Sequence, residues 1–218
     1  MSVHAWHFLP DDGKMRYPPH TKVEVGQTLT CDGPPSLCKH GFHASRRAID
    51  ALSYAPDALA CRVIVGGEIH NGNDKLAGTQ RTVIAMADAT MLLHAFACDV
   101  AEKALDECGD DDPRSRRAIE VKRLWIAGKA TDSELDDAVD AAGYSASYAD
   151  WYAAWNAARY SARCDAVYAA RHAARCAAAY AARRAAWYAD RDAAIDVYNA
   201  DLEQRLFDLL EIKPEISE

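Results

Sequence analysis

The stretch "LACRVIVGGEI" at residues 59–69 decides the fold class, because it is the clearest β-strand in the chain. Val63 and Val65 fall on one face of such a strand and Ile64 falls on the other, so apolar side chains line both faces. The double glycine at residues 66–67 lets the strand bend or end. A strand of this kind needs partners, and we expect them within the first 90 residues.

Three other stretches of this region have strand patterns, and one has a helix pattern. The strand patterns are "HAWHFL" (4–9), "TKVEVGQTLT" (21–30, interrupted by Gly26) and "RTVIAMA" (81–87, a strand or a short helix). The helix pattern is "SRRAIDALSYA" (45–55), which Ser45 can cap and which Pro56 ends. The region is therefore predicted to form a small mixed α/β domain.

From about residue 88 the sequence becomes helical in character. Thr131 and Glu134 match the S/T-x-x-E capping box, and no Gly or Pro occurs between Gly143 and Pro214. We therefore predict an α+β fold. Its expected parts are a mixed α/β domain over 1–90, connecting helices over 91–130, and an all-α, alanine-rich helical bundle over 131–213.

The alanine-rich region contains a four-residue repeat from Tyr144 to Ile195, as in "YAARHAARCAAA" at 168–179. The third position is Ala in eleven of thirteen units. Because four residues overshoot one helical turn by about 40°, this small-residue stripe spirals around the helix. We expect the segment to be wrapped by partner helices, which a second copy could supply as a homodimer, or to break at Ser161, Asp165 or Asp190.

The net charge of −8 argues against nucleic acid and anionic membranes as partners. The arginines and tyrosines of the repeat could form a basic, aromatic face for nucleic acid, but they spiral with the alanines and so form no single face. No apolar stretch is long enough to span a membrane, and the N-terminus lacks a signal-peptide pattern. With seven cysteines, an odd number, we expect reduced thiols in a bacterial cytoplasm.

The stretch "KHGFHASRRAIDALSYA" at 39–55 carries the clearest chemical signal. Gly41 permits a tight turn, and His43 and Ser45 precede the predicted helix, whose free N–H groups favour an anion. The alternative is a capped helix whose histidine satisfies a backbone group. Polar groups downstream could reach the same cleft, namely Glu68, Asp74, Lys75 and Arg81, although Asp74 and Lys75 could equally form a solvated turn pair.

Residues 31–43 contain four Cys and His side chains, which are residue types that bind zinc. Cys31, Cys38, His40 and His43 are all ligand types for zinc, but their spacing matches no common zinc pattern. We therefore predict no metal, and interpret the cysteines as buried thiols.

Five motifs together resemble an uncharacterised family found in phages and in bacteria that carry prophages. They are "CKHGFHAS" (38–45), "DALSYAP" (50–56), "CRVIVGGEI" (61–69), "NDK" (73–75) and "QRTVI" (80–84), followed by the alanine-rich tail. Similar tails occur in proteins labelled as immunity proteins. The resemblance implies a non-enzymatic phage or prophage accessory protein, which binds and interferes with a defence-related host protein in the host cytoplasm.

The order of these elements also resembles, in outline, small ADP-ribosyltransferases and RNA 2′-phosphotransferases. That resemblance implies an NAD or ADP-ribose site without metal. Its catalytic candidates are His43, Glu68 and Asp74, and its cofactor-binding candidates are His7, Gly41, His43, Ser45, Tyr54 and Arg81. The early histidine is not in an "HGT" motif and no clear catalytic glutamate follows. A non-enzymatic partner-binding protein and an NAD-dependent enzyme or nucleotide-binding domain both remain open.

Overall fold

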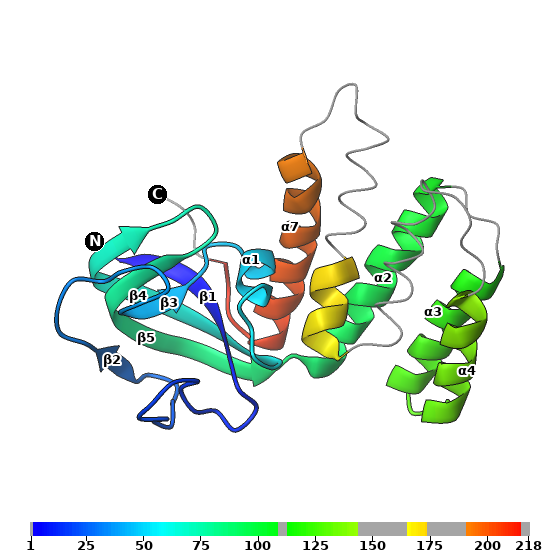
Figure 1. Cartoon of the computed structure of the whole chain (residues 1–218), viewed down its shortest axis with the longest axis horizontal. Helices are drawn as coiled ribbons and strands as arrows, with labels where there is room; N and C mark the ends of the chain where they lie inside the picture. Colours follow the sequence, from blue (N-terminus) through cyan, green and yellow to red (C-terminus); the bar gives the residue numbers. More distant parts are fainter. Residues whose placement is uncertain (1, 109–112, 144–164, 174–190, 215–218) are drawn as a thin grey trace. The chain divides into compact units, whose positions relative to one another are not determined.

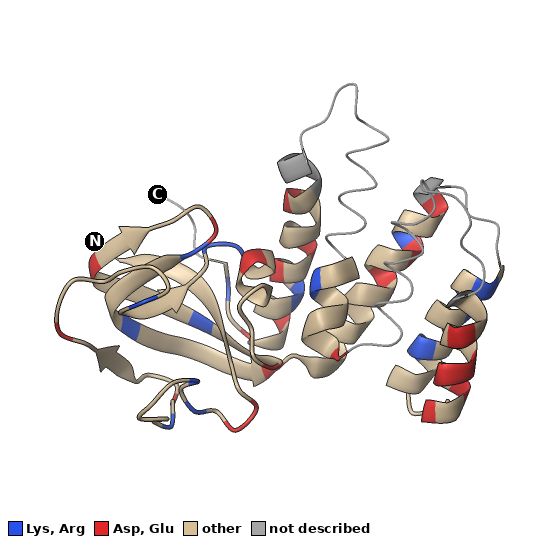
Figure 2. Ribbon diagram, viewed as in Figure 1, with Lys and Arg blue, Asp and Glu red and all other residues tan. Residues whose placement is uncertain are grey.

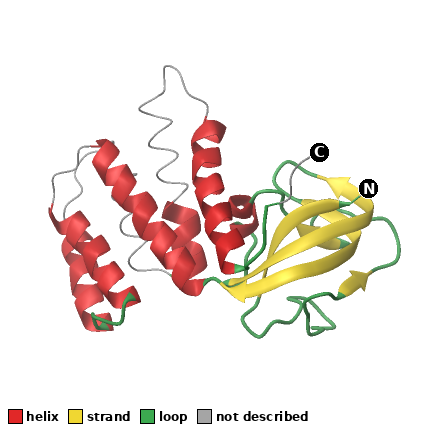
Figure 3. Ribbon diagram, turned by 180° about the vertical axis from the view of Figure 1, so that it is seen from behind, coloured by secondary structure: helices red, strands yellow, loops and turns green. Residues whose placement is uncertain are grey.

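The computed structural model describes residues 2–108, 113–143, 165–173 and 191–214. Two compact units divide the chain. The first combines Met1–Ala89 with Asn199–Glu218, and the second is Thr90–Tyr198. We call them the sheet unit and the helical unit. An antiparallel sheet forms the first and helices form the second (Figure 3), so the predicted α+β fold is confirmed.

Three strands make up most of the sheet: β1 (Val3–Leu9), β4 (Leu59–Asn71) and β5 (Leu76–Asp88). The strand order is β1-β4-β5-β2, with all pairs antiparallel, and β2 is Thr28–Thr30 (Figure 1). The strands predicted at 4–9 and 59–69 are confirmed, and residues 81–87, for which a strand or a short helix was open, belong to a strand; β4 and β5 extend further along the chain than predicted.

The sheet closes on itself through β3 (Phe42–Ala44), which pairs with β5. Ser45 follows β3 and exchanges two backbone hydrogen bonds with Trp6 of β1, of 2.7 and 2.9 Å. The ring β1-β4-β5-β3 therefore leaves few open edges. Its enclosed face carries the apolar core of the unit, which includes Ala5, Leu9, Val23, Ala44, Cys61, Val63, Val65, Leu76 and Val83.

Two local predictions in this unit are wrong. The strand expected over 21–30 is reduced to β2, because Gly26 has a φ of +84° and turns the chain. Val23 joins the core while Val25 is 56% exposed. Ser45 does not cap the following helix, since its backbone is paired with Trp6; α1 (Ala48–Leu52) starts after Arg47, which makes no side-chain cap.

The N-terminus of α1 is capped from α7 (Arg191–Leu209), at the other end of the chain. Glu203 Oε1 accepts the Ala48 N–H at 3.0 Å and also the Trp6 indole N–H at 3.0 Å. Asn199 Oδ1 accepts the Ile49 N–H at 3.1 Å. These bonds satisfy the free N–H groups that a local N-cap residue normally satisfies.

An aromatic cluster reinforces this contact. The Trp6 and Phe207 rings lie 5.1 Å apart between centroids, and the Arg62 guanidinium lies 4.7 Å from the Trp6 ring and 5.3 Å from the Phe207 ring. Trp6 is fully buried. The sequence boundary near residue 90 agrees with the structure. Residues from Asn199 onward, which we assigned to the helical bundle, instead complete the sheet unit.

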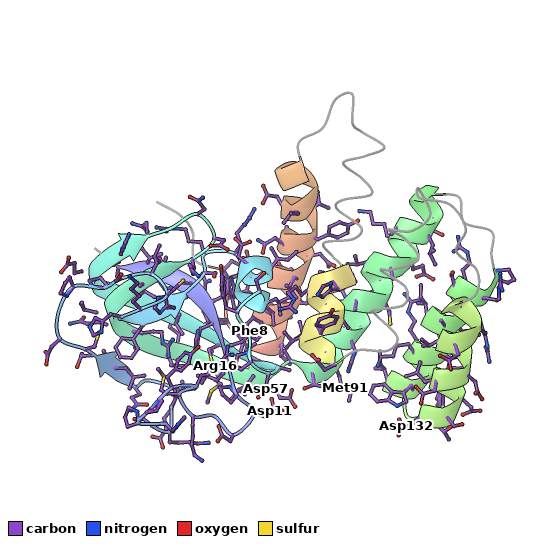
Figure 4. All side chains as sticks on the ribbon, in the orientation of Figure 1. Phe8, Asp11, Arg16, Asp57, Met91 and Asp132 are labelled. Atoms are coloured by element: carbon purple, nitrogen blue, oxygen red, sulfur yellow. The ribbon has the colours of Figure 1, made fainter. Side chains whose placement is uncertain are left out.

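The helical unit begins with α2 (Thr90–Cys108), α3 (Pro113–Ile126) and α4 (Asp132–Gly143). The predicted capping box is confirmed, because Glu134 Oε2 accepts the Thr131 N–H at 2.8 Å and Thr131 Oγ1 accepts the Glu134 N–H at 3.2 Å. Asp132, labelled in Figure 4, accepts the Trp125 indole N–H at 2.7 Å. These contacts fix the turn between α3 and α4.

Most of the four-residue repeat lies outside the described residues, as do Ser161 and Asp190. Within 165–173, a helix starts at Asp165, whose Oδ1 accepts the Tyr168 N–H at 2.9 Å. One of the three predicted break positions is therefore a helix N-cap. The alanines at positions 169, 170 and 173 are fully buried, as expected for close packing.

Across the described ranges, no helix combines the length and the apolar character needed to cross a membrane.

Replacing Glu203 with Ala should lower the free energy of unfolding by about 1–3 kcal/mol, because two buried N–H donors lose their acceptor. Gln204→Ala is the matched control, since Gln204 is exposed and bonds only Asp208 of its own helix. Chemical denaturation of the full chain measures both. Equal losses for the two variants would show that the Glu203 contact contributes nothing specific.

Candidate functional site

His7 lies on the enclosed face of the sheet, in the middle of β1. Its direct cross-strand partner in β4 is Cys61, so the two side chains point to the same face. The His7 ring makes no hydrogen bond within the described part of the chain. Burial lowers the pKa of His7 well below its usual range, and the positive charge of Arg81 lowers it further. His7 is therefore a neutral imidazole at physiological pH.

Arg81 of β5 points to the same enclosed face, opposite Val65 of β4. It is 1% exposed. Its Nη1 donates to the His43 carbonyl at 3.0 Å, its Nη2 donates to Met15 Sδ at 3.1 Å, and its guanidinium lies 5.4 Å from the Phe42 ring centroid. The remaining nitrogen, Nε, has no hydrogen-bond partner among the described residues. Arg81 is thus buried with one carbonyl oxygen and one weakly accepting thioether as its hydrogen-bond partners.

No carboxylate among the described residues pairs with Arg81. Burial lowers the pKa of Arg81 to about 10, and the group that acts against this shift is the Cys61 thiol. Burial also raises the pKa of Cys61 to about 12, so this thiol stays neutral. Arg81 is therefore charged at physiological pH with no counter-ion in the described ranges, an arrangement that costs several kcal/mol in an apolar core. An anion bound at this face would offset that cost.

His43 contributes its backbone to this site, while its ring stabilises the preceding loop. The ring Nε2 accepts the Cys38 N–H at 2.9 Å, which places the ring proton on Nδ1. Burial lowers the pKa of His43, and a hydrogen bond with the Gly41 backbone opposes that shift. Gly41 has a φ of +94°, as expected for a tight turn. This matches the alternative in which the histidine satisfies a backbone group.

The neighbouring histidine also stabilises the loop, because His40 Nε2 lies 2.6 Å from the Asp32 carbonyl oxygen. Over the ranges that the structure describes, no three His, Cys, Asp or Glu side chains are grouped so that they could hold a metal ion.

Tyr54, Asp74 and Lys75 form a second polar cluster, at the turn between β4 and β5. The Tyr54 hydroxyl donates to Asp74 Oδ2, and the Lys75 ammonium lies 4.1 Å from the Tyr54 ring centroid. Contact with the Cys38 thiol raises the pKa of Lys75. Asp74 and Lys75 therefore have specific partners and do not form a simple solvated pair.

The remaining predicted site residues make no side-chain hydrogen bond or ion pair with His7 or Arg81 within the described part of the chain. Glu68 is exposed at the irregular part of β4, where its N–H bonds Thr79 Oγ1. Ser45 is buried and pairs with Trp6. The charges that act on His7 are those of Arg81 and His43, and neither Glu68 nor Asp74 is among them. The catalytic roles of Glu68, Asp74 and His43 remain predictions.

Two residues of the site were missed in the sequence. Cys61 could have been found, because it precedes Val63 and Val65 on the same face of the predicted strand. Met15 carries no such signal. It lies in a long loop, and only the tertiary structure brings its sulfur to Arg81.

Residues 4–95 match a family model described as a domain of unknown function, DUF7666. The match runs from β1 into α2 and includes His7, His43 and Arg81, but it stops before the C-terminal residues that complete the sheet unit. No curated protein and no solved structure matches the chain.

Arg81→Met should raise the midpoint of thermal unfolding of the ligand-free chain, because it replaces an uncompensated buried charge with an apolar side chain. Arg62→Met is the matched control. Arg62 is also buried, but it packs between two aromatic rings, and its loss should cost about 1–3 kcal/mol. Thermal unfolding of the two variants should therefore shift in opposite directions. A strong destabilisation by Arg81→Met would mean that the charge is well satisfied in the free protein.

Proposed function

We propose that the sheet unit binds a small anionic ligand of the nucleotide type, such as NAD or ADP-ribose, at His7 and Arg81. The observation that supports this proposal is the buried Arg81 guanidinium, which has no carboxylate partner among the described residues and an unpartnered Nε. Arginine is the side chain best suited to phosphate and carboxylate oxygens, because its planar fork donates two parallel hydrogen bonds.

His7 would serve a different part of the same ligand. Its ring is neutral, and within the described chain it has no hydrogen-bond partner, so it can bond a hydroxyl or amide group of a sugar or base. The core residues around it, including Cys61 and Val63, offer apolar contact. Such a site suits a nucleotide, in which a charged phosphate lies beside an uncharged, polar sugar and base.

Binding is the part of the NAD hypothesis that the geometry supports. In the enzymes that the chain resembles, a carboxylate often steers the acceptor group, and Glu68 and Asp74 are the candidates. Glu68 is exposed, and Asp74 accepts a hydrogen bond from Tyr54. An ADP-ribosyltransferase activity therefore stays a prediction from resemblance.

The proposal is tested by thermal shift with inorganic phosphate, succinate, ADP-ribose and NAD. We expect ADP-ribose or NAD to stabilise the wild-type chain by about 3 kcal/mol at ~100 times its dissociation constant. Arg81→Met should abolish the shift, and His7→Ala should weaken it. Arg117→Met, at an exposed arginine of α3, should leave it unchanged.

The four probes separate the possible sources of the anion. A shift with phosphate alone indicates a phosphate site without nucleotide recognition, and a shift with succinate indicates a carboxylate ligand. Absence of any shift, or an equal shift in Arg81→Met, contradicts the proposal.

We also propose a partner-binding role for the helical unit, in line with the phage accessory function implied by the family resemblance. The observation that favours it is the charge of α4, which carries five acidic residues and no Lys or Arg (Figure 2). Such a surface suits a basic site on a bacterial host protein.

Neutralising Asp136 and Asp137, which are exposed and form none of the caps of α4, should reduce capture of a host protein in a pull-down. Capture should also fall with rising salt. The matched control neutralises Glu24 and Glu211, two exposed residues of the sheet unit, by substitution with Gln. Equal capture by all three proteins contradicts a role for α4.

A further inference from the structure

The Nη2 of Arg81 donates to Met15 Sδ at 3.1 Å. A thioether is a weak acceptor, and a buried guanidinium is normally matched with a carboxylate, phosphate or carbonyl oxygen. Nε and Nη2 lie on the same edge of the guanidinium, the edge that binds two oxygens of one oxyanion. Met15 contacts one donor of that edge, and the other donor has no partner in the part of the chain that the structure describes.

Met15 lies in a short hairpin formed by residues 13–23, which we call the 13–23 hairpin. Its two arms are joined by hydrogen bonds from Met15 N–H to the Thr21 carbonyl and from Val23 N–H to the Gly13 carbonyl, both of 2.9 Å. Just before the hairpin, the Asp11 N–H bonds Asp57, and the two residues lie side by side in Figure 4.

The 13–23 hairpin contributes one fully buried side chain, Val23, to the core. Val23 and Met15 are its apolar side chains that pack against the core cluster, and its tip is exposed, with Tyr17 at 69%. A segment with few buried contacts opens at low free-energy cost. Movement of the 13–23 hairpin would take Met15 away from Arg81 without breaking the pairing of β1, β4 and β5.

We infer that, in the ligand-free protein, the Met15 sulfur occupies the position that an oxygen of the bound oxyanion takes; we call this the placeholder role of Met15. The sulfur leaves that position when the 13–23 hairpin opens. This inference rests on the proposed function and specifies which group of the ligand Arg81 recognises. The ligand presents two oxygens of one phosphate or carboxylate to Nε and Nη2 of Arg81. The oxyanion displaces the thioether because its two oxygens accept charge-assisted hydrogen bonds from both donors.

Two substitutions at Met15 should change affinity for ADP-ribose in opposite directions. Met15→Leu keeps the volume but removes the competing acceptor, so the dissociation constant should fall roughly three- to tenfold. Met15→Gln supplies an amide oxygen that competes more strongly, so the dissociation constant should rise by a similar factor. Met91→Leu, at an exposed methionine of α2 labelled in Figure 4, should leave it unchanged. Isothermal titration calorimetry measures all four proteins.

Methyl NMR of methionine-labelled wild-type protein gives a second measurement, independent of how the variants fold. Saturating ADP-ribose should shift the Met15 methyl resonance and leave the Met91 resonance in place. Changes in the same direction for both Met15 variants, or an unmoved Met15 methyl, overturn the placeholder role while the Arg81 site stands. If wild-type protein binds none of the four probes, the proposed function is overturned and this inference with it.

Discussion

The hydrogen bond from the Trp6 indole to the Glu203 carboxylate joins the two ends of the chain, and the sheet unit depends on it. The same carboxylate oxygen caps α1, and α1 directly follows the segment that carries His43 and Ser45. The Trp6–Arg62–Phe207 cluster packs beside it. A strand, a short helix and the C-terminal helix therefore fold as one unit, although nearly 200 residues separate Trp6 from Glu203.

The enclosed face of the sheet contains a conflict between stability and function. An apolar core is most stable when it holds no charge, yet Arg81 lies inside it with a carbonyl and a thioether as its acceptors. Arg62 is equally an arginine on this sheet, but its guanidinium lies against two aromatic rings, those of Trp6 and Phe207. The difference between these two arginines is the reason to regard Arg81, and not Arg62, as a binding residue.

Sequence patterns located part of the site. Strand alternation assigns His7 and Cys61 each to one face of its strand. The motif "CKHGFHAS" predicted the tight turn at Gly41 and offered His43 as a residue that satisfies a backbone group. The patterns could not show that the His43 ring is used by its own loop, because that depends on the Cys38 N–H pointing back at Nε2. Nor could they separate Glu68 and Asp74 from His7, since the register shift near Gly66 changes which residues of β4 and β5 are opposed.

The sequence by itself determined the α+β class, the strand from residue 59, and the capping box at Thr131, because short-range spacing and local hydrogen bonds carry these features. Tertiary structure alone decided the closure of the sheet at Ser45, the cap that Glu203 gives to α1, and the contact between Met15 and Arg81. Each of these contacts joins segments that are far apart in the sequence. Whether such segments meet depends on how the whole sheet twists and packs, and a local pattern of residues does not encode this.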